Sequence, residues 1–162
     1  MGPPVRAWVG DIVAKYQPQS PVLEVGAYDV NGTIRDLFPQ DGYVGLDIRE
    51  GPGVDMVADI INPPKILLER FNTVVCCETL EHISKFWVAM EKMYDALLPG
   101  GLFIGTWVFV CHIHEHPEDY WRCTPAGFRF LLEDVGFVDV QIDTQGDGPV
   151  GVFAVARKAQ RN

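Results

Sequence analysis

Short and almost uniformly apolar runs recur along this chain, with helical patterns between them. The clearest are Val22–Val25, Tyr43–Leu46 and FNTVVCCE at residues 71–78, and Val54–Val57 is a weaker one. Runs this short and this apolar are typical of strands in a parallel sheet that is covered on both faces. The sequence therefore predicts an α/β fold, with Val54–Val57 as a short edge strand.

Helices are predicted where apolar residues recur with helical spacing or where proline suits a first turn. The expected helices, long and brief, are Val5–Tyr16, Thr33–Phe38, Pro63–Arg70, Ser84–Leu98 and Pro125–Val135. Pro99-Gly100-Gly101 is expected to end the fourth helix before a strand with the sequence LFIGTWVFV, and Gly136 suits the C-terminal cap of the fifth.

The last two expected strands, Val138–Asp143 and Val150–Arg157, are joined by the turn-rich segment TQGDGP at residues 144–149. A parallel pair needs a connection of roughly a dozen or more residues. These two strands must therefore be antiparallel, and we expect a mostly parallel sheet that ends in a β-hairpin.

Composition restricts the partners. The 162 residues, 48% of them hydrophobic, fit one domain over residues 1–162. A net charge of -9 disfavours nucleic acid, because non-specific affinity for phosphates comes mainly from Lys and Arg. No stretch approaches the roughly 20 apolar residues that span a bilayer, so we expect no membrane partner and a cytoplasmic location. The four cysteines do not form a disulfide framework and are expected to be reduced.

A carboxylate, Glu24, stands inside the first apolar run, two residues before Gly26. Ligands of open α/β sheets bind beyond the carboxyl ends of the strands, and a buried unpaired carboxylate costs several kcal/mol. Glu24 is therefore expected to meet a ligand's ammonium group or backbone N–H donors. Alternatively, its side chain turns into solvent or pairs with an arginine.

Two further acidic residues follow expected strands. Asp47 lies about 20 residues beyond Gly26, where a carboxylate can accept hydrogen bonds from both hydroxyls of a ribose. Asp59 follows the expected third strand. It either lies beside an adenine edge together with the backbone of Ile60, or caps a helix.

Four segments together resemble motifs of the class I S-adenosylmethionine-dependent methyltransferases: VLEVGAYDVNGT, YVGLDI, FNTVVCCETLEHI and ALLPGGLFIGT. The resemblance covers nearly the whole chain. It implies a three-layer, Rossmann-like sandwich with a seven-stranded sheet in the order 3-2-1-4-5-7-6 and an antiparallel last strand. It also implies S-adenosylmethionine as the cofactor and, from the GAYDVNG first motif, membership of a small-molecule or sugar-modifying subset.

The resemblance implies roles for individual residues. The loop from Glu24 to Gly32 would hold the methionine part of the cofactor, Asp47 the ribose, and Asp59 and Ile60 the adenine, while Cys77 and Glu78 would face cofactor and substrate. The candidate cofactor residues are Glu24, Gly26, Ala27, Tyr28, Asn31, Gly32, Asp47, Ile48, Asp59, Ile60, Cys77 and Glu78.

The first motif departs from the family's G-x-G-x-G pattern, because Ala27 and Tyr28 follow Gly26 and the next glycine is Gly32. Asn31-Gly32 can still close the loop at positive φ. The same departure argues against a dinucleotide site, whose G-x-G-x-x-G pattern lets the backbone approach a pyrophosphate.

Methyl transfer is an in-line displacement, so the protein's main contribution is to position the acceptor. The candidates for catalysis are His82, His112, His114 and Tyr120. His82, in the triplet LEH, is either a base or a structural residue at a helix start. By the resemblance, Tyr120, Trp121 and Arg122 close over the acceptor or brace the pocket. We favour a core position for Trp121, while Arg122 binds an acidic acceptor or pairs with Asp119 or Glu118.

His112, His114 and His116 would share one face of an extended loop, a spacing that permits a metal site with Cys111 or Cys123. Alternate histidines without a carboxylate anchor are more often polar loop residues. The sequence therefore favours a substrate lid over a metal site.

The predicted function is methyl transfer from S-adenosylmethionine to an oxygen or nitrogen of a small-molecule acceptor, for example a sugar or a glycan-linked metabolite. The alternatives are a non-catalytic module that binds the cofactor or a partner, and an NAD or nucleotide-sugar enzyme.

Overall fold

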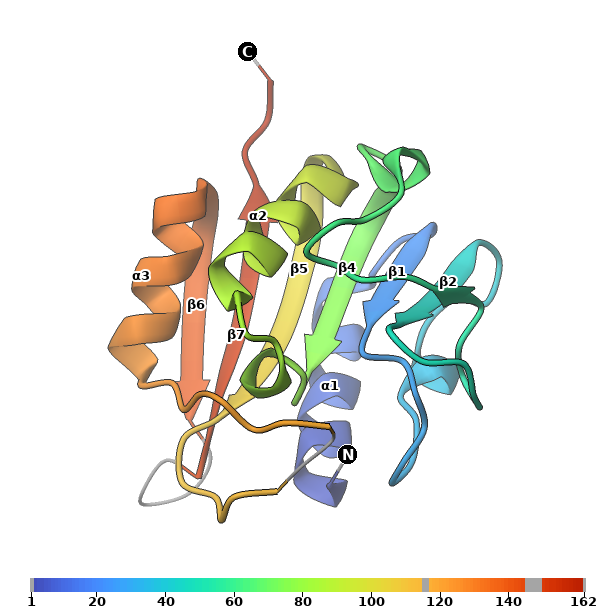
Figure 1. Ribbon diagram of the computed structural model, residues 1–162. Coiled ribbons are helices and arrows are strands. Elements are labelled where there is room, and N and C mark those ends of the chain that lie inside the picture. The colour runs from blue at the N-terminus through green and yellow to red at the C-terminus, as the bar shows by residue number, and fades with distance from the viewer. Residues whose placement is uncertain (1, 115–116, 145–149, 162) are drawn as a thin grey trace.

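A seven-stranded sheet forms the centre of the computed structural model, which describes residues 2–114, 117–144 and 150–161 (Figure 1). The strands are β1 (Val22–Val25), β2 (Tyr43–Asp47), β3 (Met56–Val57), β4 (Phe71–Cys77), β5 (Leu97–Val108), β6 (Phe137–Thr144) and β7 (Gly151–Lys158). Their order is β3-β2-β1-β4-β5-β7-β6. β1 to β5 pair in parallel, and β7 is antiparallel to both β5 and β6. The predicted topology and terminal hairpin are confirmed.

Helices cover both faces of the sheet and make three layers (Figure 1). α2 (Phe86–Ala96) and α3 (Pro125–Val135) share one core cluster with the sheet, and α1 (Pro3–Tyr16) shares a second cluster on the other face. Each cluster removes a continuous apolar surface from water, which is the main source of stability for such a sandwich. The four cysteines are free thiols, as expected. Across the described ranges, no helix combines the length and the apolar character needed to cross a membrane.

The helix predicted to reach Leu98 ends at Ala96 instead. Leu97 already pairs with Phe71 of β4, so β5 runs through Pro99-Gly100-Gly101 with a register shift. The side chain of Lys158 explains the early stop, since its Nζ donates to the carbonyls of Tyr94 at 3.0 Å and Leu97 at 2.8 Å. A cation at a helix C-terminus adds a donor to the last carbonyls, of which that of Tyr94 also accepts the N–H of Leu97.

The two brief helices are also shorter than predicted. They are single 3₁₀ turns, η1 (Arg35–Leu37) and η2 (Lys65–Leu67). η1 buries none of its residues and η2 buries only Leu67. Short helices depend on tertiary packing of an apolar face for their stability, and these segments offer almost none. Apart from Thr144, the predicted connector TQGDGP lies outside the described residues, as does His116.

The chain reverses direction across the sheet between β1 and β4, because β2 lies on one side of β1 and β4 on the other. The carboxyl ends of β1, β2, β4 and β5 point to the same edge, the lower edge in Figure 1, and the segment after β5 passes below β4 and β5. This switch point is where open α/β sheets place their ligands.

Candidate active site

A cavity of about 390 Å³ opens at this switch point. Its walls come from the loop after β1, the ends of β2 and β4, the turn after β3 and the segment after β5. All twelve candidate cofactor residues line it, and so do His82, His114 and Tyr120. His112 is not among the lining residues; its side chain is exposed and its carbonyl accepts a hydrogen bond from Arg122. Residues from five chain segments thus meet at one site.

Glu24 is buried on β1, with 6% of its surface exposed, and its partner is the hydroxyl of Tyr43, which donates to Oε2 at 2.8 Å. This partner differs from those that the sequence suggested. Burial raises the pKa of Glu24 to about 7, against the lowering effects of the Tyr43 hydrogen bond and the nearby charge of Arg35. The carboxyl group therefore changes charge near neutral pH.

Asp47 ends β2, two residues beyond Gly45, the register partner of Glu24. Its Oδ2 accepts from the backbone N–H of Tyr28 at 3.2 Å and its Oδ1 from that of Arg49 at 3.1 Å. These bonds fix the carboxylate and leave lone pairs on both oxygens for further donors. Glu24 and Asp47 therefore reach the same cavity from neighbouring strands.

The loop after β1 closes by backbone contacts to its own surroundings. Gly26, at φ +82°, and Ala27 both donate their N–H groups to the carbonyl of Leu46. Gly32, at φ +109°, donates to Oδ1 of Asp29, as expected for a loop that closes at this glycine. The loop leads into η1, a three-residue turn, where a dinucleotide-binding fold has a helix N-terminus.

Asp59 and Ile60 lie in the turn that follows β3. Oδ1 of Asp59 accepts the N–H of Ile61 at 3.0 Å, which is a turn contact and not the N-cap of a helix. Ile60 is buried and Ile48 is 60% exposed, and both line the cavity. This end of the cavity is therefore apolar, with a carboxylate at its edge.

The end of β4 supplies the inner wall. Cys77 is buried, and burial raises the pKa of its thiol, so the group is neutral. Glu78, at φ +49°, donates its N–H to the carbonyl and the hydroxyl oxygen of Thr106, each at 3.1 Å. Thr79 then packs against Gly26, where a Cβ would lie 2.1 Å from the threonine hydroxyl. The chain segments that follow β1 and β4 are therefore in close contact.

The segment after β5 docks on the 3₁₀ turn η3 (Leu80–His82) through the N–H groups of Tyr120 and Trp121, which both donate to the carbonyl of Glu81. The guanidinium of Arg122 donates to both carboxylate oxygens of Asp119, to Oδ1 at 2.5 Å and to Oδ2 at 2.7 Å. These bonds hold the pKa of Asp119 well below its usual range. The pairing of Arg122 with Asp119, one of the predicted alternatives, is the one found. The core position predicted for Trp121 is wrong: the ring packs edge-on against Phe86 of α2 at 5.3 Å between ring centroids, but 38% of the residue is exposed because the segment lies at the surface.

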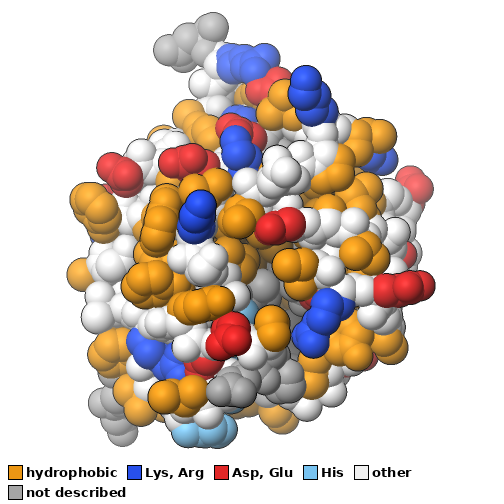
Figure 2. Space-filling view, in the orientation of Figure 1, with side chains coloured by type: hydrophobic (Ala, Val, Ile, Leu, Met, Phe, Trp, Pro, Cys, Tyr) orange, Lys and Arg blue, Asp and Glu red, His pale blue; other side chains and the backbone are white. Residues whose placement is uncertain are grey.

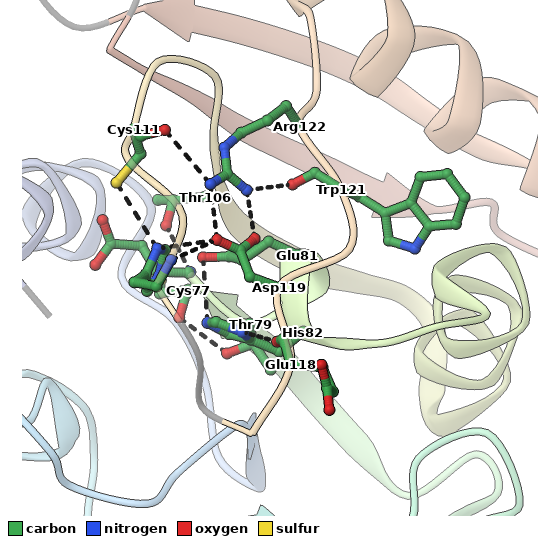
Figure 3. Close-up of polar contacts among 12 residues, drawn as sticks. Cys77, Thr79, Glu81, His82, Thr106, Cys111, Glu118, Asp119, Trp121 and Arg122 are labelled. Atoms are coloured by element: carbon green, nitrogen blue, oxygen red, sulfur yellow. Dashed lines mark hydrogen bonds and ion pairs between the residues drawn. The ribbon is translucent and has the colours of Figure 1, made fainter.

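Glu81 follows the fourth strand with Glu78 and His82 but was not among the candidate site residues; it belongs to η3 and is fully buried where this segment docks (Figure 3). Among the described residues, neither of its carboxylate oxygens has a hydrogen-bond partner. Burial raises its pKa to about 8. The available signal was its position in the LEH triplet, four residues beyond the buried end of β4 and next to the buried Leu80.

The fold matches solved structures of methyltransferases. The CurJ carbon methyltransferase superposes with a TM-score of 0.74 at 15% identity, over 96% of this chain and 54% of that one. The 1,6-didemethyltoxoflavin-N1-methyltransferase of Burkholderia thailandensis, with bound 1,6-didemethyltoxoflavin and S-adenosylhomocysteine, gives 0.73 at 18% identity, over 98% and 78% of the two chains. A SAM dependent methyltransferase from Archaeoglobus fulgidus gives 0.65 at 16% identity, over 94% of each chain.

No protein-family model matches the sequence, and no curated protein sequence matches it significantly. At identities of 15–18% the structural likeness establishes the fold, which is the seven-stranded, Rossmann-like fold of the class I methyltransferases. The chain spans about half the length of the CurJ enzyme. Membership of a subset with the GAYDVNG motif stays a prediction.

Proposed function

We propose that this chain is an S-adenosylmethionine-dependent methyltransferase that acts on an oxygen or nitrogen of a small molecule. One observation carries the proposal: the carboxylates of Glu24 and Asp47 stand on paired neighbouring strands and line one cavity at the switch point of a methyltransferase fold. Their positions suit the two polar ends of an adenosyl amino acid.

The donors and acceptors around the cavity fit this cofactor. Asp47, fixed by two backbone N–H groups, has lone pairs for the two hydroxyls of the ribose. Ile48 and Ile60 offer an apolar wall for the adenine, with Asp59 at its edge. Glu24 would meet the ammonium group, since a positive charge nearby favours the ionised form of its carboxyl.

S-adenosylmethionine supplies a methyl group on a sulfonium, so the reaction needs an acceptor held in line and no metal or redox chemistry from the cofactor. Tyr120, His82 and His114 border the cavity beyond the end of β4 and form the acceptor side in this proposal. An imidazole in this position has the chemistry of a general base for the acceptor. The thiol of Cys77 is neutral and buried, which excludes it as a nucleophile.

A dinucleotide is the weaker ligand for this site. The N–H groups of Gly26, Ala27 and Gly32, which a pyrophosphate would need, are donated to acceptors within the protein. On the face seen in Figure 2, the described Lys and Arg side chains are scattered among Asp and Glu, an arrangement that offers little to a polyanion.

Calorimetry tests the cofactor assignment. Folded wild-type protein should bind S-adenosylhomocysteine and not NAD. Asp47→Ala should weaken the binding of S-adenosylhomocysteine about tenfold or more, because two charge-assisted hydrogen bonds are lost. Asp11→Ala, which removes an exposed carboxylate on α1 outside the cavity, is the control and should bind like the wild type. Absence of binding by folded wild-type protein would refute the assignment.

Transfer of a labelled methyl group to a panel of hydroxyl and amine acceptors, sugars included, tests the enzyme assignment. Turnover with any of them supports a methyltransferase. Intact cofactor binding without turnover across the panel would favour the alternative of a non-catalytic binding module.

A further inference from the structure

Three potential metal ligands converge at the acceptor side of the cavity. Glu81 and His82 come from η3, and His114 comes from the segment after β5. One ligand atom from each lies within 4.8 Å of the other two. The sequence placed the histidines in a loop without a carboxylate anchor; the fold supplies that anchor from a turn more than thirty residues earlier in the chain.

The buried carboxylate of Glu81 needs a partner. It is fully buried, and within the described part of the chain neither oxygen accepts a hydrogen bond. Nε2 of His82 lies 3.9 Å from its Oε1. A carboxylate in this position costs several kcal/mol unless a cation or a strong donor compensates it.

Both imidazole rings are oriented by their Nδ1 atoms. Nδ1 of His82 lies 2.6 Å from the carbonyl oxygen of Glu118, so it carries the proton and donates it. Nδ1 of His114 lies 3.2 Å from Oδ2 of Asp119 and 3.2 Å from the carbonyl oxygen of His112, which again assigns the proton to Nδ1. In each ring the lone pair is therefore on Nε2.

This pattern is the one that metal-binding histidines show, with one nitrogen donating to a carbonyl or carboxylate and the other ligating the ion. Asp119 is itself held by the guanidinium of Arg122 (Figure 3), so the orienting groups are fixed as well. Ligands around a tetrahedral ion lie about 3.3 Å apart, so binding an ion requires the cluster to close by up to about 1.5 Å.

We propose that Glu81, His82 and His114 bind a divalent transition-metal ion of the Zn²⁺ class at the acceptor side of the cavity. Two imidazoles and one carboxylate suit such an ion and are poor ligands for Mg²⁺, which prefers oxygen. Three protein ligands leave a coordination position open. Since His82 and His114 line the cavity, this position faces it, and an acceptor oxygen is the ligand that it would take. The role of the acceptor oxygen rests on the proposed methyltransferase function, whereas metal binding does not.

Calorimetry with ZnCl₂ on the metal-stripped full chain tests the site. We expect one ion per chain for the wild type, at least hundredfold weaker binding for Glu81→Gln and for His114→Gln, and binding within about twofold of wild type for His112→Gln. His112 is the matched control because it lies in the same segment outside the cluster. MgCl₂ should bind far more weakly than ZnCl₂. Visible absorption of the Co²⁺-loaded protein should show the intense bands of a four-coordinate site, and both ligand variants should lose them.

Circular dichroism and the melting temperature of the metal-free variants show whether they fold. Glu81→Gln keeps the shape of the side chain and buries no charge, so it should fold. The site is refuted if folded wild-type protein binds no Zn²⁺, if folded Glu81→Gln binds it like the wild type, or if His112→Gln loses as much affinity as His114→Gln. Binding of S-adenosylhomocysteine by metal-free Glu81→Gln should stay as in the wild type, so a failure of the metal site and a failure of the proposed function are separate results.

Discussion

Glu24 illustrates how one buried side chain couples charge to stability. Its pKa lies at about 7 in the folded protein and near 4.5 in an unfolded chain. Between these values the folded state holds a proton that the unfolded state has lost. The resulting contribution to stability is fully present below about pH 4.5 and is lost as the pH rises through about 7.

The neutral variant Glu24→Gln should escape this loss. We expect its free energy of unfolding, relative to that of the wild type, to rise by up to about 3 kcal/mol between pH 4.5 and pH 8, measured by chemical denaturation. Glu50→Gln, at an exposed position, is the control and should track the wild type. A constant difference between Glu24→Gln and wild type across this range would show that Glu24 does not titrate in this way.

Gly26 is the residue at which backbone conformation matters most. Its φ is +82°, and an added Cβ would overlap the side chain of Thr79. Gly26→Ala should lower the free energy of unfolding by at least about 2 kcal/mol, through backbone strain and overpacking. Gly10→Ala, within α1 and with nothing within 4 Å of the new Cβ, should instead raise it by up to about 1 kcal/mol. Thermal denaturation of the two variants measures both changes in stability. Equal changes for Gly26→Ala and Gly10→Ala would contradict a special role for the backbone conformation of Gly26.

At the scale of elements, the junction between α2 and β5 depends on Lys158. This side chain is buried and bonds the carbonyls of Tyr94 and Leu97. Lys158→Met fills the same space but removes the donor to both carbonyls, of which only that of Tyr94 keeps the backbone N–H of Leu97 as a described partner, so we expect a loss of about 2 kcal/mol in the free energy of unfolding. Lys92→Met breaks only a partly exposed pair with Asp95 on α2 and should cost less than about 0.5 kcal/mol. A Lys158→Met protein as stable as the Lys92→Met control would disprove the capping role.

The elements were predictable to different degrees. The strands were predicted correctly because buried parallel strands are uniformly apolar. The short connector between β6 and β7 required these two strands to be antiparallel. The strand order came from the motif resemblance. The end of α2 was missed because it depends on Lys158, 61 residues after Leu97, and the lengths of η1 and η2 were overestimated because these segments bury little apolar surface, in η2 only Leu67.

At the scale of the whole molecule, the sheet topology assembles the site. Parallel strands bring their carboxyl ends to one edge, so the position of Asp47, Cys77 and Glu78 beside Glu24 followed from the sequence. The contact between η3 and the segment after β5 did not, because no local pattern reveals which loops dock on each other. That contact buries Glu81, brings His114 to His82 and leaves His112 outside the cavity.

The measurement that most directly tests how the cavity is used is a crystal structure of the protein with S-adenosylhomocysteine. We predict the ribose hydroxyls within hydrogen-bonding distance of the Asp47 carboxylate and the amino-acid end of the ligand at Glu24. A ligand in the reverse orientation, or one bound away from the edge where β1 and β2 end, would contradict the roles assigned to Glu24 and Asp47.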